Sequence, residues 1–206
     1  MQLILVRHAE PVRVAPGEVS GPVDPTLTGR GRAQAERLAG WLAAETVDHV
    51  VTSPMRRAVE TAAPLAAALG LEPQVDDRIS EYDRHADHYI PVEELRVTGD
   101  DRWTAMIEGR WQEFGADDPE VFRARVVAAL EDTVAAHPGE RVVLVGHGGV
   151  INVYTAHVLG IDRLLWVDVG YTSITRIAAA RSGERSLLTL NETAHLVSVR
   201  VEEVQS

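Results

Sequence analysis

The chain lacks two residue types altogether, cysteine and lysine. The absence of cysteine excludes a disulfide, a thiolate metal site and a cysteine nucleophile. All 20 basic residues are arginine. The absence of lysine excludes a Walker-type phosphate loop and a Schiff-base mechanism, because both depend on a lysine amine.

Long apolar runs are also missing. No stretch reaches the length of a membrane span, and the N-terminus has no charged leader followed by an apolar segment. We therefore expect a cytoplasmic protein with no membrane partner. The formal net charge of −11 argues against nucleic acid and anionic membranes as the main partners.

Apolar residues make up 45% of the chain and charged residues 25%, which is ordinary for a globular protein. A length of 206 residues allows one domain or two and is enough to bury a sizeable core. No repeat, low-complexity tract or linker interrupts the chain. We therefore expect a single domain over residues 1–206.

Strand-like and helix-like patterns alternate along the sequence. Apolar runs predict strands at 3–7, 47–53, 141–146, 173–180 and 185–192. Helical spacing predicts helices after Thr28 within 24–45, and at 54–69, 119–137 and 147–160. We expect Ser53 and Asp118 to cap two of these helices, because a proline follows each of them. The alternation predicts an α/β fold, a three-layer α/β/α sandwich around a mostly parallel sheet.

The segment 82–118 does not follow this alternation and is rich in charged residues. We interpret it as an insertion that covers the substrate. Its candidate substrate contacts are histidine, arginine and tryptophan side chains: His85, His88, Arg96, Trp103 and Trp111. The alternative is that the two tryptophans belong to the core.

Cationic and imidazole side chains follow three of the predicted strands. Arg7 and His8 follow the first, residues 53–57 follow the second, and His147 follows the strand at 141–146. In doubly wound α/β folds, ligands bind beyond the carboxyl ends of the strands. A single histidine or arginine is more often structural, but several at the strand ends of one sheet indicate a site.

Arginine and histidine side chains gathered in this way suit a phosphoryl group. Guanidinium groups bind phosphate oxygens bidentately, and a neutral imidazole is a competent nucleophile near pH 7. Two imidazoles could also bind a metal ion, but a catalytic metal site usually needs a third ligand, and no HxH or HExxH motif occurs. We therefore expect no metal and no cofactor.

Four stretches in this order resemble the histidine phosphatase superfamily, also called the phosphoglycerate mutase-like family. They are "LVRHAE" (5–10), "LTGRGRAQA" (27–35), "SPMRRAVETA" (53–62) and "VLVGHGGVI" (143–151). The resemblance spans nearly the whole chain. It implies the phosphoglycerate mutase-like fold and a phosphohistidine mechanism that needs no metal.

The resemblance also implies roles for individual residues. His8 matches the nucleophile that becomes phosphorylated, and Arg7 matches the first arginine of the phosphate pocket. The second pocket arginine precedes an alanine in the family, which selects Arg57 over Arg56, and neighbours on a helix point about 100° apart. His147 matches the second histidine, which binds the phosphate and stabilises its transition state, and we expect Gly148 after it to bind the phosphate as well.

The general acid of the family is a glutamate after the third strand, and "RISEYD" puts Glu81 there. Asp83 and Asp87 are the next candidates. One departure concerns the phosphate-binding asparagine of many members, whose position holds Val14 here.

Arg13 stands where those members have a tryptophan, and Ser20 with Gly21 matches a Ser-Gly substrate contact of the sugar-acid mutases. Arg13, Ser20 and Gly21 are therefore candidate substrate contacts.

The sequence thus predicts a phosphomonoester hydrolase, similar to histidine acid phosphatases, that acts on a small phosphorylated metabolite. One alternative is a phosphoglycerate mutase-type phosphotransferase. The other is a non-catalytic regulatory protein that binds phosphate. Apart from the substrate, the partner that we consider is a second copy of the chain, in a homodimer.

Overall fold

The central sheet is built from the apolar runs of the sequence, in a computed structural model that describes residues 1–197. The described strands are β1 (Gln2–Arg7), β2 (His49–Thr52), β3 (Gln74–Val75), β4 (Arg141–Gly146), β5 (Ile174–Ala179) and β6 (Arg185–Glu192). Their order in the sheet is β3-β2-β4-β1-β5-β6. The pairings from β3 to β1 are parallel, whereas β5 and β6 are antiparallel to their neighbours. The last residues of the expected domain, 198–206, lie outside the described part.

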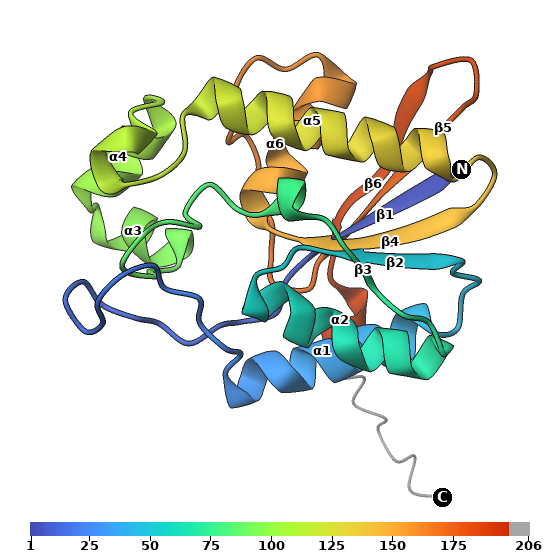
Figure 1. Ribbon diagram of the computed structural model, residues 1–206, viewed down its shortest axis with the longest axis horizontal. Helices are drawn as coiled ribbons and strands as arrows, with labels where there is room; N and C mark the ends of the chain where they lie inside the picture. The colour runs from blue at the N-terminus through green and yellow to red at the C-terminus, as the bar shows by residue number, and fades with distance from the viewer. Residues whose placement is uncertain (198–206) are drawn as a thin grey trace, which may run out of the picture.

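The helices of the described part connect these strands (Figure 1). They are α1 (Gly29–Leu42), α2 (Arg56–Leu69), α3 (Val92–Thr98), α4 (Asp101–Ile107), α5 (Pro119–Ala136) and α6 (Gly148–Leu159). Short 3-10 turns lie at η1 (Asp77–Ile79), η2 (Trp111–Phe114) and η3 (Ala194–Leu196). In residues 1–197, no helix is both long enough and apolar enough to cross a membrane.

The alternation of side chains along β1 separates two cores. Ile4 and Val6 pack with α1 and α2 on one face of the sheet, whereas Leu3 and Leu5 pack with α5 and α6 on the other. All four side chains are fully buried. This arrangement confirms the predicted α/β fold with three layers.

One predicted helix start is right and another is wrong. Asp118 caps α5 by accepting hydrogen bonds from the backbone N–H groups of Glu120 and Val121. Ser53 does not cap α2, because that helix begins at Arg56 with Met55 in the cap position. The hydroxyl of Ser53 lies instead 2.8 Å from Nε2 of His147.

The segment 82–118 forms α3, α4 and η2, which lie beyond the carboxyl ends of the parallel strands (Figure 1). Its two tryptophans differ in position. Trp111 is buried and packs against Tyr82 and Phe122 in the core, as the alternative interpretation predicted. Trp103 lines a cavity at the strand ends.

The loop after His8 is held by a close backbone approach to α1. The carbonyl of Glu10 accepts a hydrogen bond from the Thr28 N–H at 2.9 Å. A Cβ atom on Gly31 would lie only 2.1 Å from that carbonyl oxygen. Glycine at position 31 therefore allows the loop to dock on the helix.

We predict that Gly31→Ala destabilises the protein by about 1–3 kcal/mol, the usual cost of overpacking, because the backbone of Glu10 must move. Gly40 provides a control on the same helix, since a Cβ there has nothing within 4 Å. Gly40→Ala should stabilise by roughly 0.5–1 kcal/mol, because alanine loses less backbone entropy in a helix. Urea unfolding measures both changes, and equal effects would contradict this account of Gly31.

Candidate active site

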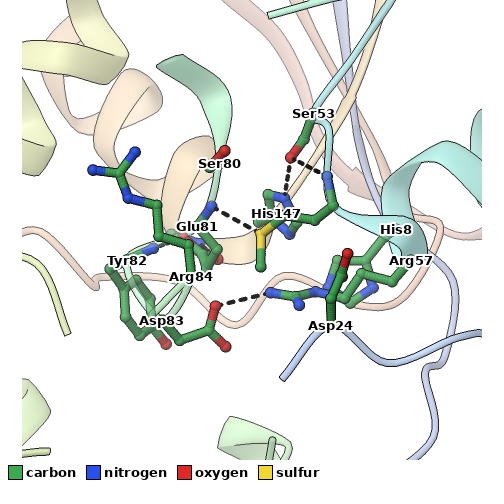
Figure 2. A network of polar contacts seen from close by, with 12 residues as sticks. His8, Asp24, Ser53, Arg57, Ser80, Glu81, Tyr82, Asp83, Arg84 and His147 are labelled. Atoms are coloured by element: carbon green, nitrogen blue, oxygen red, sulfur yellow. Dashed lines mark hydrogen bonds and ion pairs between the residues drawn. The ribbon is translucent and has the colours of Figure 1, made fainter. Parts of the chain in front are cut away.

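Three strand ends bring the candidate residues together at one edge of the sheet. Since β2, β4 and β1 are neighbours, Ser53, His147 and His8 lie side by side there (Figure 2). The rings of His8 and His147 are 5.2 Å apart and inclined by 61°. The structure therefore confirms the predicted convergence of these segments.

A cavity of about 310 Å³ opens at this edge. Its walls come from the strand ends, the segment 82–118 and the loop 163–169. Side chains and backbone of the candidate residues line it: Arg7, His8, Arg57, Glu81 and Gly148. His147 is fully buried behind this surface.

His8 is buried, and its ring has one defined tautomer. Its Nδ1 lies 2.8 Å from the Ala9 carbonyl oxygen. Because a carbonyl only accepts, Nδ1 carries the proton and Nε2 keeps its lone pair. Burial, followed by the charges of Arg57 and Arg7, lowers the pKa of His8 well below its ordinary value. The imidazole is thus neutral and nucleophilic at Nε2.

Ser53 orients the second histidine. Its Oγ accepts a hydrogen bond from the Met55 N–H at 3.3 Å, and within residues 1–197 the one acceptor for its own proton is Nε2 of His147 at 2.8 Å, so the hydroxyl donates to that nitrogen. The proton of the His147 ring is then on Nδ1, which is buried and has no partner in residues 1–197. Burial and the nearby Arg57 also lower the pKa of His147, so this ring is a neutral donor.

Arg7 and Arg57 are buried guanidinium groups, 5% and 1% exposed. Arg7 donates to the carboxylate of Glu93 and the carbonyl of Val169 and lies 4.0 Å from the ring centroid of Tyr171. Arg57 donates to Oδ1 of Asp83 at 2.9 Å. Each of the two arginines keeps N–H groups that these partners do not bind.

The remaining donors point to an anionic ligand. Within the described residues, Nε of Arg7 and both Nε and Nη1 of Arg57 are buried without a partner, as is Nδ1 of His147. Helix α6 also begins at Gly148 on the cavity wall, and the N-terminus of a helix favours a negatively charged ligand. The described residues place no three metal-ligating side chains together here. The donors fit a phosphoryl group.

Glu81 lies on the cavity wall and is 6% exposed. Its Oε2 accepts a hydrogen bond from the Gly149 N–H at 2.8 Å, and its Oε1 accepts one from the Tyr82 N–H at 3.2 Å. A Cβ on Gly149 would lie 2.3 Å from Oε1, so glycine is required for this contact. Burial and the neighbouring charge of Asp83 raise the pKa of Glu81 to about 7.

The structure does not bring all the predicted contacts to this cavity. Arg13 is half exposed and forms an ion pair with Glu94 at 3.0 Å, while Ser20 and Gly21 are exposed in their loop. These three residues are not on the cavity wall. Arg13 is held instead by Glu94, and the loop that carries Ser20 and Gly21 is anchored at Val14, whose backbone pairs with that of Tyr89.

The segment 82–118 brings only some of its candidate substrate contacts to the cavity. Arg96 and Trp103 line the cavity, whereas His85 is exposed and His88 pairs with Asp87. Arg56 is exposed beside the buried Arg57, as the spacing on the helix predicted.

Several residues that shape the site were not predicted from the sequence. Tyr89 and Tyr171 pack on the guanidinium groups of Arg57 and Arg7, and no local pattern marks them. Asn152 holds the loop 163–169 through hydrogen bonds with the backbone of Trp166 and Val167. Gly149 could have been found, because it is the second glycine of the "HGG" stretch that begins at His147.

Comparison with known proteins identifies relatives of this chain. The family model of the histidine phosphatase superfamily (branch 1) matches residues 3–193. Phosphoserine phosphatase 1 of Hydrogenobacter thermophilus is 32% identical, with 98% of this chain and 97% of that protein covered. Phosphoglycerate mutase-like protein 4 of Arabidopsis thaliana is 33% identical, with 73% and 67% covered.

Solved structures share the fold. A mycobacterial glucosyl-3-phosphoglycerate phosphatase superposes with a TM-score of 0.74 at 23% identity, over 93% of this chain and 99% of that one. The phosphoserine phosphatase of Entamoeba histolytica in complex with 3-phosphoglyceric acid gives a TM-score of 0.69 at 23% identity, over 95% and 99%. These structures support the assignment of the fold.

We predict that Arg57→Ala weakens the binding of inorganic phosphate by about 10–100-fold, because charge-assisted hydrogen bonds contribute roughly 1.5–3 kcal/mol. Arg56→Ala, which removes the exposed neighbour, should change the affinity less than about 2-fold, as exposed charges contribute little. Isothermal titration calorimetry with phosphate measures both. Equal losses would contradict the assignment of Arg57 to the anion site.

Proposed function

This chain belongs to the histidine phosphatase superfamily, and from that premise we propose that it hydrolyses small phosphomonoesters through a phosphohistidine at His8. One observation carries the proposal: the lone pair on Nε2 of His8 lies in a pocket in which several buried arginine and histidine donors have no partner among residues 1–197. Preorganised donors in a dry site stabilise the charge of a phosphoryl group in transfer.

In the first step, Nε2 of His8 attacks phosphorus and a P–N bond forms as the P–O bond to the leaving group breaks. Arg7, Arg57 and His147 bind the equatorial oxygens. Arg7 binds through its Nε–H, which has no partner in residues 1–197, so that Nη1 keeps its hydrogen bond to the Glu93 carboxylate. Glu81, which is protonated below pH 7, gives its proton to the leaving oxygen.

In the second step, water attacks the phosphorus and the P–N bond breaks. Glu81, now a carboxylate, accepts the proton of the water, which returns it to its starting state. His8 again carries its lone pair on Nε2, and phosphate leaves. The step consumes one water and needs no metal or cofactor.

The pKa of Glu81 predicts the pH dependence of the first step. For an alkyl phosphate, the single-turnover rate should fall about tenfold per pH unit above pH 7, because the acid form of Glu81 is lost there. Glu81→Gln should remove this dependence and slow the alkyl phosphate by about 10²–10⁴-fold. p-Nitrophenyl phosphate needs no proton on its leaving group and is the control. A uniform loss with both substrates would assign Glu81 a structural role.

The substrate class that we propose is a phosphorylated carboxylic acid. Beyond the phosphate site, the cavity is lined by Arg96 and Arg163. Arg96 pairs with Asp168, whereas Arg163 has no acidic partner within residues 1–197 and can bind a carboxylate. The relatives support this class. Two of them are named as phosphatases of phosphoserine or of a phosphoglycerate derivative, and two solved structures contain phosphoserine or 3-phosphoglyceric acid.

We predict that Arg163→Ala raises KM for phosphoserine and 3-phosphoglycerate about 5-fold, because a partly exposed charge-assisted hydrogen bond contributes roughly 1 kcal/mol. KM for phosphoethanolamine, which has no carboxylate, should stay the same. Arg56→Ala is the matched control for loss of an arginine outside the cavity. Equal changes with all three substrates would contradict carboxylate binding by Arg163.

Water is the acceptor that the charges of the cavity favour. A mutase must retain a bisphosphorylated intermediate against water, which requires a strongly cationic and closed pocket. Here Asp83, Glu93 and Asp168 neutralise Arg57, Arg7 and Arg96, which leaves Arg163 as the one arginine of the cavity wall without an acidic partner in residues 1–197, so the pocket is not strongly cationic. The position of the phosphate-binding asparagine holds Val14, which offers no donor.

We predict that, with 3-phosphoglycerate primed by 2,3-bisphosphoglycerate, phosphate is released faster than 2-phosphoglycerate forms. A coupled assay run beside phosphate detection measures both rates. Isomerisation that exceeds phosphate release would make the protein a mutase. Tight phosphate binding without turnover of any substrate, p-nitrophenyl phosphate included, would make it a non-catalytic binding protein.

A further inference from the structure

A second cluster of chemically active side chains lies at the opposite edge of the sheet. His49 begins β2, His137 follows the last residue of α5, and Glu140 precedes β4. This is the edge at which the N-terminus also lies (Figure 1). Since β4 has six residues and rises about 3.3 Å per residue, roughly 20 Å of strand separates the cluster from the phosphate pocket.

A tight turn places Glu140 against His137. Pro138 and Gly139 form the centre of the turn, with Gly139 at φ +91°, and the Glu140 N–H donates to the His137 carbonyl at 3.3 Å. Proline followed by a glycine with positive φ is typical of a type II turn. The turn directs the carboxylate back over the helix end, and Oε2 of Glu140 lies 2.9 Å from Nδ1 of His137.

The sheet brings in the third residue. β2 is parallel to β4, with His49 opposite Val142, and the Asp48 N–H donates to the Arg141 carbonyl at 2.9 Å. Nε2 of His49 thereby lies 3.1 Å from Oε2 of Glu140. The ring centroids of His49 and His137 are 4.2 Å apart.

The three residues form a convergent donor set. Their ligand atoms all lie within 4.8 Å of one another, and no other such group of three occurs in the described residues. Zinc–nitrogen bonds are about 2.0–2.1 Å long, which puts the corners of a tetrahedral site roughly 3.3 Å apart. Both nitrogens already lie near this distance from Oε2 of Glu140.

The chemistry of the donors selects a class of ion. Two imidazoles and one carboxylate suit Zn²⁺ and its neighbours in the Irving–Williams order, whereas Mg²⁺ and Ca²⁺ prefer oxygen ligands. The chain has no cysteine that could compete. The histidines of the phosphate pocket face Arg7 and Arg57, whose charges oppose a cation there.

We propose that His49, His137 and Glu140 bind one zinc-class divalent ion, with water in the remaining coordination position. The side chains are partly exposed, so solvent reaches the site. The ion would tie the C-terminal end of α5 to the starts of β2 and β4. It takes no part in the phosphatase reaction, because the two sites lie at opposite ends of the sheet.

Titration of the chelator-treated full chain with ZnCl2 by isothermal titration calorimetry tests the site. One Zn²⁺ should bind per chain. Loss of a residue that only supports a metal ligand lowers metal affinity about 10–100-fold. His49→Ala and His137→Ala each remove a ligand and should weaken zinc binding by more than that. Glu140→Gln, which keeps the shape of the side chain, should also weaken it. His157→Ala, which removes an exposed histidine of α6, should leave the affinity unchanged.

A second readout separates a built site from general surface binding. Zn²⁺ should raise the Tm of the wild type and of His157→Ala but not of His49→Ala, because the ion binds only the folded site. Co²⁺ should give the visible bands of a four- or five-coordinate site in the same two proteins. Chelator should not change the rate with p-nitrophenyl phosphate. Equal zinc affinity in wild type, His49→Ala and His137→Ala, or no binding, would overturn the proposal.

Discussion

The burial of two guanidinium groups at the ends of parallel strands is the constraint on which the site depends. Arg7 and Arg57 are almost inaccessible to water, yet neither finds partners for all its N–H groups in the described residues. A buried donor without a partner costs about 1–3 kcal/mol. Asp83 and Glu93 neutralise part of the charge and leave the inner donors open. The pocket therefore offers open donors that suit an anion with several oxygens.

The same charges set the protonation states that the proposed reaction needs. Arg57 and Arg7 add to burial in keeping His8 neutral, so that its lone pair remains available. Glu81 lies beside Asp83 in a dry part of the wall, which raises its pKa and keeps its proton to about pH 7. A neutral imidazole and a protonated carboxylic acid thus coexist in one cavity, as the proposed mechanism requires. When the surroundings of two titratable groups shift their pKa values apart in this way, the shifts typically identify which group acts as the acid and which as the base.

Much of this site could be predicted because its main residues directly follow strands. Parallel neighbours bring their carboxyl ends together, so the positions of His8 and His147 followed from the strand pattern, and Arg57 followed from the resemblance to the family. The sequence could not reveal partners that only the tertiary fold supplies, such as Tyr171, which packs on Arg7 from a distant loop. Arg13 was assigned by counting residues from the first strand, and such a count cannot reveal that its guanidinium pairs with Glu94 outside the cavity wall. The sheet order, with its antiparallel edge, also depends on packing that no local pattern contains.

The phosphohistidine at His8 is the central claim, and trapping it is the most direct test. Glu81→Gln treated with p-nitrophenyl phosphate should accumulate the intermediate, because the leaving group needs no acid whereas the attack of water lacks its base. After an alkaline quench, mass spectrometry of the peptides should locate the phosphate on His8, in a linkage that survives base and is lost in acid. The double variant with His8→Ala should show no label. Phosphate on another residue, or turnover in His8→Ala close to that of the wild type, would contradict the account.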